Sequence, residues 1–263
     1  MTEPKARREP RIDGPTLALR DGVVLVAPGG AYVPSERTLI VADTHAGLPL
    51  ELRARGHTVP VGDDEALFGK VRAMIALTGA ETLVIAGDFA HGAGSSRRAL
   101  GDGRSPVETF VDTFSSGSTC RAVRVVLGNH DKSLSSALSS MGVEHGEWLS
   151  VGSHRVVHGD DVSRACALRA EANAIGGRVI VGHVHPALAL DDGEGARRVC
   201  PAFVSARGLL CLPALSVWAR GGDVRSRTVR AQLEALADGD PMGVAVIVGE
   251  RVLPIGSVFG ERP

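Results

Sequence analysis

Five short polar motifs follow one another along the chain, and each stands directly after an apolar stretch. They offer carboxylate, amide and imidazole groups, all of which can bind divalent cations. The motifs are Asp43-Thr44-His45, Gly87-Asp88, Gly128-Asn129-His130-Asp131, Val157-His158-Gly159-Asp160 and Gly182-His183-Val184-His185. A mixed set of oxygen and nitrogen donors suits Mn²⁺, Fe²⁺ or Zn²⁺ better than Mg²⁺ or Ca²⁺, which prefer oxygen. The motifs therefore predict a site for two divalent metal ions, with Mn²⁺ as the first expectation.

The spacing within the motifs indicates how the ions would be held. Asp43 and His45 are two residues apart, as are His183 and His185, so on an extended backbone each pair points to one face. Asp88 has two carboxylate oxygens and can bridge two ions. Two ions about 3.5–4 Å apart can hold a hydroxide between them and neutralise the attacking and leaving oxygens of a displacement at phosphorus. This arrangement predicts hydrolysis of a phosphoester without a protein nucleophile.

Other polar residues beside the motifs are candidates for proton transfer and substrate binding. His130 follows Asn129 on the opposite side of the chain, so we expect it to act as a general acid, with Asp131 orienting its ring and raising its pKa. His91 follows Asp88 closely and is a candidate to touch a metal ligand or a substrate phosphate. Arg97 and Arg98 are candidates to steer phosphate toward the site, although arginines in such a loop are commonly solvated surface.

The apolar stretches before the motifs predict strands at residues 38–42, 82–86, 123–127, 155–157 and 178–181. Apolar residues at helical spacing predict a helix over 64–79 and shorter helices over 107–114 and 132–141. After residue 145 the pattern predicts mostly strands, at 147–151, 155–158, 178–182, 198–205, 209–212 and 244–249. Together these elements predict an α/β fold in which two sheets lie between helices. We expect residues 1–14 to form a mobile tail and residues 15–263 to form a single domain.

Composition narrows the class of protein but says little about the substrate. The formal net charge is −1, so no global basic field indicates a nucleic acid. The four cysteines form no C-x-x-C pair and lie in or beside apolar segments, which favours reduced thiols over a disulfide framework. No apolar segment resembles a signal peptide or is long enough to span a membrane, so we expect a cytoplasmic protein.

In type and order the five motifs resemble those of the calcineurin-like metallophosphoesterases. Wider strings such as GHVHPAL at 182–188 look like the SbcD-related archaeal-type phosphoesterases, close to the PdeM group of ligase-associated DNA-damage-response endonucleases. The resemblance implies a four-layer sandwich with the metals at its edge. It implies Asp43, His45, Asp88 and His185 on the first metal, and Asp88, Asn129, His158 and His183 on the second. It also implies His130 as the catalytic acid.

The chain departs from the pattern of that family in two places. It has Asp160 where many members have a second histidine, and it has no room for the capping domain with which larger relatives grip DNA. Our leading hypothesis is a phosphodiesterase acting on DNA or a nucleotide through a metal-bridging hydroxide. Because the capping domain is missing and the net charge is near neutral, a phosphomonoesterase or cyclic-nucleotide phosphodiesterase stays an alternative hypothesis. A third alternative is a scaffold without catalysis that binds a DNA ligase or helicase in DNA repair.

Overall fold

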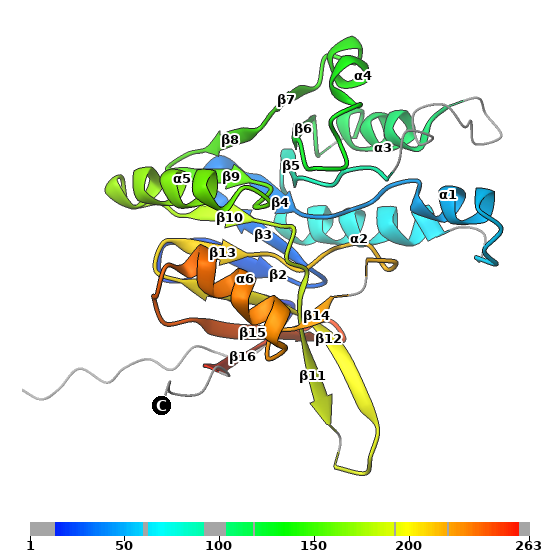
Figure 1. The fold of residues 1–263 in the computed structure, drawn as a ribbon. Coiled ribbons are helices and arrows are strands. Elements are labelled where there is room, and N and C mark those ends of the chain that lie inside the picture. Colours follow the sequence, from blue (N-terminus) through cyan, green and yellow to red (C-terminus); the bar gives the residue numbers. More distant parts are fainter. Residues whose placement is uncertain are drawn as a thin grey trace, which may run out of the picture.

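Two mixed β-sheets pack face to face, and helices cover their outer faces (Figure 1). This arrangement comes from a computed structural model that describes residues 14–59, 63–91, 104–117, 119–191, 193–219 and 221–257. The predicted tail lies, but for its last residue, outside these ranges. Within them, no helix combines the length and the apolar character needed to cross a membrane.

The first sheet carries the three motifs that come first in the sequence. Within the described residues its strands run in the order β1-β2-β3-β4-β5-β6-β7. Their bounds are β1 Thr16–Ala18, β2 Val24–Val26, β3 Gly30–Val33, β4 Thr38–Val41, β5 Thr82–Ala86, β6 Ala122–Val126 and β7 Glu144–Gly146. The strands from β4 to β7 are parallel, so the carboxyl ends of β4, β5 and β6 lie at the same edge.

The second sheet carries the two histidine motifs. Its described strands follow the order β14-β11-β12-β13-β10-β9-β8, with β15 on β12 and β16 on β15. Their bounds are β8 Trp148–Val151, β9 His154–Val157, β10 Val179–Val181, β11 Pro186–Asp191, β12 Arg197–Ala206, β13 Leu209–Cys211, β14 Gly222–Asp223, β15 Gly243–Val248 and β16 Arg251–Gly256. Strands β9, β10 and β13 are parallel, whereas β12 runs antiparallel to β13. The first half of β12 therefore extends past the carboxyl ends of its neighbours and pairs there with β11 as a projecting hairpin (Figure 1).

Three apolar layers hold the sheets and helices together. The helices are η1 Pro34–Glu36, α1 Leu48–Ala54, α2 Asp63–Thr78, α3 Pro106–Ser115, α4 Ser135–Ser140, α5 Val162–Ala174 and α6 Arg227–Ala237. Ile40, Val84 and Ile180 belong to the layer between the sheets. One outer layer joins the first sheet to α2 and α3, and the other joins the second sheet to α5 and α6. The predicted α/β sandwich is thus confirmed.

The six strands predicted after residue 145 are confirmed as β8, β9, β10, β12, β13 and β15, but the helices α5 and α6 in that part of the chain were not predicted. Helix α5 buries mainly small alanines and the arginine Arg169, so its sequence lacks a clear apolar face. Helix α6 does place Val229, Leu233 and Leu236 at helical spacing behind the N-cap Ser226, which is a signal that the prediction overlooked. The predicted free thiols are found: Cys120, Cys166, Cys200 and Cys211 form no disulfide.

Candidate metal centre

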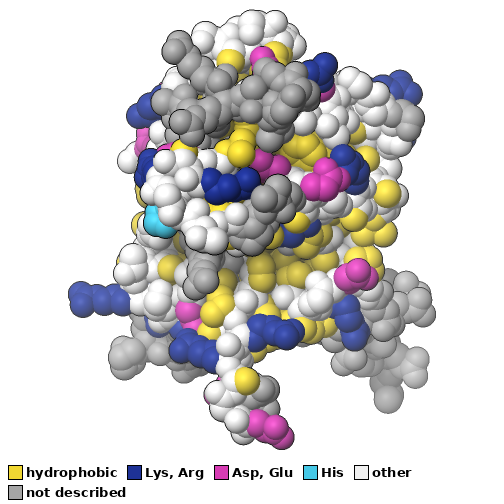
Figure 2. Space-filling view, turned by 90° about the vertical axis from the view of Figure 1, so that its right-hand side faces the viewer, with side chains coloured by type: hydrophobic (Ala, Val, Ile, Leu, Met, Phe, Trp, Pro, Cys, Tyr) yellow, Lys and Arg dark blue, Asp and Glu magenta, His cyan; other side chains and the backbone are white. Residues whose placement is uncertain are grey.

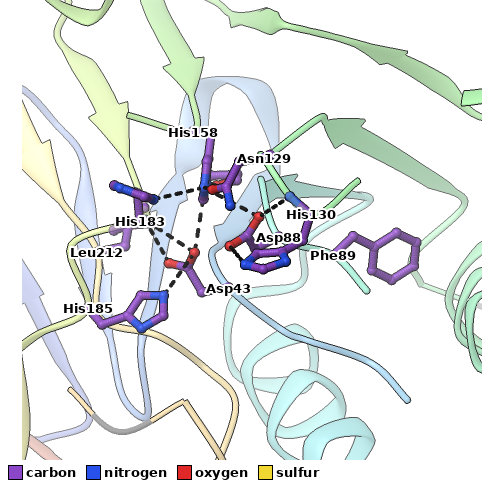
Figure 3. A network of polar contacts seen from close by, with 12 residues as sticks. Asp43, Asp88, Phe89, Asn129, His130, His158, His183, His185 and Leu212 are labelled. Carbon is purple, nitrogen blue, oxygen red and sulfur yellow. Dashed lines mark hydrogen bonds and ion pairs between the residues drawn. The ribbon is translucent and has the colours of Figure 1, made fainter. Parts of the chain in front are cut away.

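The five motifs meet at one edge of the sandwich because each follows a strand that ends there. Asp43, Asp88 and Asn129 come from the first sheet, after β4, β5 and β6, and His158, His183 and His185 come from the second, after β9 and β10 (Figure 3). The two sheets are also joined directly, since the His183 backbone N–H donates to both oxygens of the Asp43 carboxylate, at 3.2 and 3.0 Å. The candidate site is therefore built across the seam between the sheets.

One group of donors surrounds the ring of His158. Its Nε2 lies 3.0 Å from Asn129 Oδ1, 3.2 Å from His183 Nδ1 and 3.4 Å from Asp88 Oδ1. Its Nδ1 is 3.3 Å from the Ala86 carbonyl oxygen, a contact that directs the other nitrogen toward the site. Two ligands of one transition metal lie roughly 3–3.5 Å apart, given bonds of about 2.1 Å. These four side chains therefore fit around a single cation.

A second group consists of Asp43, His45 and His185, whose donor atoms lie within 4.8 Å of one another. His185 Nε2 is 3.2 Å from Asp43 Oδ1, yet it is buried and makes no hydrogen bond among the described residues. Such an orphaned nitrogen beside a carboxylate fits a shared cation. Asp88 lies between the groups, because its Oδ2 is 4.0 Å from His45 Nε2 while its Oδ1 faces His158.

The carboxylates of Asp43 and Asp88 require positive charge. Asp43 is 0% exposed and Asp88 is 3% exposed. Within the described part of the chain, neither forms an ion pair with Lys or Arg, and the nitrogen-bearing side chains within 4.0 Å of them are histidines. A buried carboxylate is stable when it is paired or bound to a metal. The donor set and its burial thus fit two divalent cations.

Burial also keeps two of these imidazoles ready to bind metal. Burial lowers the pKa of His45 to about 4, although Asp88 and Asp43 oppose this shift. Burial likewise lowers the pKa of His183. At His185 burial acts in the same direction, but contact with Asp43 outweighs it and the pKa is raised. Neutral His45 and His183 offer a lone pair to a metal at neutral pH.

The backbone at five of the seven candidate ligands is left-handed rather than extended. Asp43, His45, Asp88, His183 and His185 have φ angles of 52°, 45°, 47°, 65° and 49°, and the only other non-glycine residues with positive φ in the described ranges are Arg37 and Asp238. The expected extended backbone for the two alternating pairs is therefore wrong. Each ligand instead lies in a tight turn that follows its strand, and the turns aim the side chains inward. Clusters of such backbone are typical of functional sites.

Three motif glycines are needed because another motif approaches them closely. A Cβ atom on Gly87 would lie within 3.0 Å of the His158 ring. One on Gly128 would collide with the Asp88 carboxylate, and one on Gly182 with Asp43. This steric role was not predicted for these glycines, although their place beside ligands in three motifs was a signal for it.

His130 lies at the open side of the candidate centre. Its side chain is 42% exposed, its Nε2 is 3.9 Å from Asp88 Oδ2, and its backbone N–H donates to Asp88 Oδ1 at 3.2 Å. The expectation that Asp131 orients this ring is wrong. The Asp131 carboxylate points into the protein and accepts hydrogen bonds from the backbone N–H groups of Gly128, Phe89 and Ala90. Asp131 therefore ties together the turns that carry Asp88 and Asn129.

Of the candidate substrate-binding residues, His91 is the one that the structure describes. Its Nδ1 lies 3.4 Å from His45 Nδ1, on the side of that ring away from Asp88. It also packs against His130, with ring centroids 4.8 Å apart. Arg97 and Arg98 lie outside the described residues.

Comparison with known proteins agrees with this geometry. Residues 36–153 match the family model for calcineurin-like phosphoesterases. The matched segment contains the first three motifs, up to His130 and Asp131, and ends before the two histidine motifs. No curated protein sequence matches the chain.

A solved structure supports the fold over nearly the whole chain. The chain is similar to the Pseudomonas putida nuclease MPE, with a TM-score of 0.61 and 20% sequence identity, over 92% of this chain and 100% of that one. At this level of identity the likeness shows a shared fold. The calcineurin-like sandwich predicted from the motifs is therefore confirmed, and the narrower relation to SbcD-related enzymes stays a prediction.

Proposed function

We propose that this chain is a metal-dependent phosphoesterase that binds two divalent cations and hydrolyses phosphodiesters. The observation that carries the proposal is the pair of buried carboxylates, Asp43 and Asp88, set between two groups of imidazole and amide donors without a Lys or Arg partner in the described chain. The match to calcineurin-like phosphoesterases and the nuclease activity named for the similar structure support the reaction class.

We assign the seven candidate ligands to two ions. Asp43, His45, Asp88 and His185 would hold the first, and Asp88, Asn129, His158 and His183 the second. When bound, such ions neutralise phosphate oxygens and lower the pKa of water, so no protein nucleophile is required. The mixed donors favour Mn²⁺, with Fe²⁺ or Zn²⁺ as alternatives.

His130 is proposed as the general acid. Its imidazole is partly exposed beside Asp88, where it can meet a substrate and protonate the leaving oxygen. Because its backbone N–H donates to Asp88, its position depends on that carboxylate. Asp131 contributes by fixing the two turns rather than by direct proton transfer.

The test is hydrolysis of bis(p-nitrophenyl) phosphate by protein stripped of metal and resupplied with Mn²⁺. We expect turnover that depends on Mn²⁺ and falls by at least about a hundredfold in Asp88→Asn, because removing even a residue that supports a metal ligand costs roughly 10–100-fold. The matched control is Asp112→Asn, which changes a half-exposed carboxylate on α3. Equal rates in Asp88→Asn and the wild type would overturn the mechanism.

Two further outcomes would redirect the proposal. Turnover of p-nitrophenyl phosphate without turnover of the diester would indicate a phosphomonoesterase. Stoichiometric metal binding without turnover of either ester would favour a scaffold without catalysis. A DNA ligase or helicase complex as its partner, a role in DNA repair and a cytoplasmic location stay predictions from the sequence.

A further inference from the structure

A cavity of about 680 Å³ lies near the candidate metal centre but is separate from it. Its lining includes Pro186, which follows His185 in the chain, and Ser216, whose backbone N–H donates to the Asp43 carbonyl oxygen at 3.2 Å. None of the seven candidate metal ligands is among its described lining residues. Sites for small organic ligands have volumes of about 300–1,000 Å³. The cavity therefore has the size of a ligand site and needs a chemistry of its own.

Both halves of the sandwich contribute walls to this cavity. Lys70 comes from α2, which covers the first sheet, whereas Arg198 and Val199 come from the part of β12 that extends past β13. Pro213 and Val217 belong to the segment between β13 and β14. Figure 2 shows hydrophobic side chains gathered above the projecting hairpin, with Lys and Arg side chains along their lower border. The cavity thus lies between the body of the sandwich and the base of the hairpin.

Most of the cavity lining is apolar, and part of it is conformationally restricted. The lining includes the prolines Pro28, Pro186, Pro201 and Pro213, whose rings fix one backbone dihedral angle each. Val199 is 55% exposed and Val217 is 48% exposed, although both are apolar. A ligand that covers these two valines would remove apolar surface from water, which is favourable. The lining therefore suits a ligand with an apolar body.

Lys70 adds a cation to this apolar lining. Its ammonium group donates a hydrogen bond to the Leu215 carbonyl oxygen at 2.9 Å and forms no ion pair within the described chain. An ammonium group has three N–H donors, so two remain for a ligand. Burial lowers the pKa of Lys70, and no Asp or Glu occurs among the described lining residues to compensate the charge. Arg198 also lines the cavity and forms no ion pair with a described residue. The missing counter-charge favours an anionic ligand.

We propose that this cavity binds a small organic anion in which an apolar body carries one carboxylate group. The apolar body covers Val199 and Val217, and the carboxylate accepts hydrogen bonds from Lys70. An inorganic anion would leave the valines exposed to water, and a neutral apolar molecule would leave the ammonium group of Lys70 without a counter-charge. The inference goes beyond the proposed function, because it concerns a site that contains none of the candidate metal ligands.

The experiment compares octanoate with octanamide, a neutral molecule of similar size and shape, by calorimetric titration of the full chain in Mn²⁺ and again in EDTA. We expect the wild type to bind octanoate at least about tenfold more tightly than octanamide, because a hydrogen bond to a charged group contributes that much affinity. Lys70→Met keeps an apolar side chain and should abolish this preference. Val217→Asp places a carboxylate in the lining and should weaken octanoate binding about tenfold or more. The control is Arg121→Ala, which removes an exposed arginine just before β6.

The results test the cavity without any measurement of phosphoester turnover, so the inference and the proposed function can fail separately. Octanoate binding that is selective in the wild type and in Arg121→Ala, and lost in Lys70→Met and Val217→Asp with unchanged circular dichroism, would establish the site. Equal octanoate affinity in all four proteins, or no binding to the wild type at millimolar concentration, would overturn it. Binding that disappears in EDTA would place the carboxylate on the metal ions and would also overturn it.

Discussion

His91 lies behind His45, with one ring nitrogen of each residue in contact. If His45 binds a metal through Nε2, its Nδ1–H is free to donate to His91 Nδ1. Partners of this kind fix the orientation of a ligand ring and support its affinity for the metal. The contact therefore favours a positioning role for His91 over the direct contact with substrate phosphate that the sequence left open.

Substitution of His91 separates these two roles. We expect His91→Ala to weaken Mn²⁺ activation about 10–100-fold, with KM for the phosphodiester little changed at saturating Mn²⁺. His91→Asn keeps an acceptor near His45 and should recover part of the affinity. The measurement is the Mn²⁺ concentration that gives half-maximal rate. His57→Ala, at an exposed histidine, serves as the control. A raised KM at unchanged Mn²⁺ affinity would instead favour contact with substrate.

The turn after β6 leaves no room for a side chain at its glycine. Gly128 has no positive φ, so its requirement comes from space alone: a Cβ there would collide with the Asp88 carboxylate. Gly69, on α2, has nothing within 4 Å of such an atom. The two glycines therefore form a matched pair for the same substitution.

We expect Gly128→Ala to lose Mn²⁺ binding and to destabilise the fold by roughly 1–3 kcal/mol, because Asp88 and its turn must move. Gly69→Ala should keep Mn²⁺ binding and raise the free energy of unfolding by up to about 1 kcal/mol, since alanine favours a helix interior. In both variants, calorimetric titration with Mn²⁺ measures metal binding, and unfolding in urea measures the free energy of unfolding. Unchanged Mn²⁺ affinity in Gly128→Ala would contradict the close packing described for this turn.

The elements that carry the motifs could be predicted from sequence, because strands such as 82–86 are short apolar runs bounded by turn residues. The convergence of Asp43, Asp88 and His158 followed from their places after strands. The contacts of Asp131 could not be predicted, because they depend on how two turns pack against each other. Nor could the projecting hairpin, because it depends on how far β12 extends past the end of its neighbour β13.

At the scale of the whole molecule, the candidate ligands come from both sheets. Metal binding at this seam would therefore resist separation of the two halves of the sandwich. A cation that binds the folded chain alone adds about 2.7 kcal/mol to the free energy of unfolding at a concentration one hundred times its Kd.

We expect Mn²⁺ to raise the midpoint of thermal unfolding in the wild type and in Asp112→Asn, and EDTA to reverse the increase. Asp88→Asn should show little response, since it loses the carboxylate placed between both donor groups. Unfolding followed by circular dichroism at several Mn²⁺ concentrations measures this. A response in Asp88→Asn equal to that of the wild type would mean that Mn²⁺ binds elsewhere.

The left-handed backbone at Asp43, His45, Asp88, His183 and His185 has a consequence for how such a chain changes over evolutionary time. Asparagine and glycine suit this backbone well, so the conformation alone would accept either of them at each position. Aspartate and histidine also adopt this backbone more often than most side chains do. This chain has aspartate or histidine at all five positions, so the residues that supply the donor atoms are also ones that the conformation tolerates.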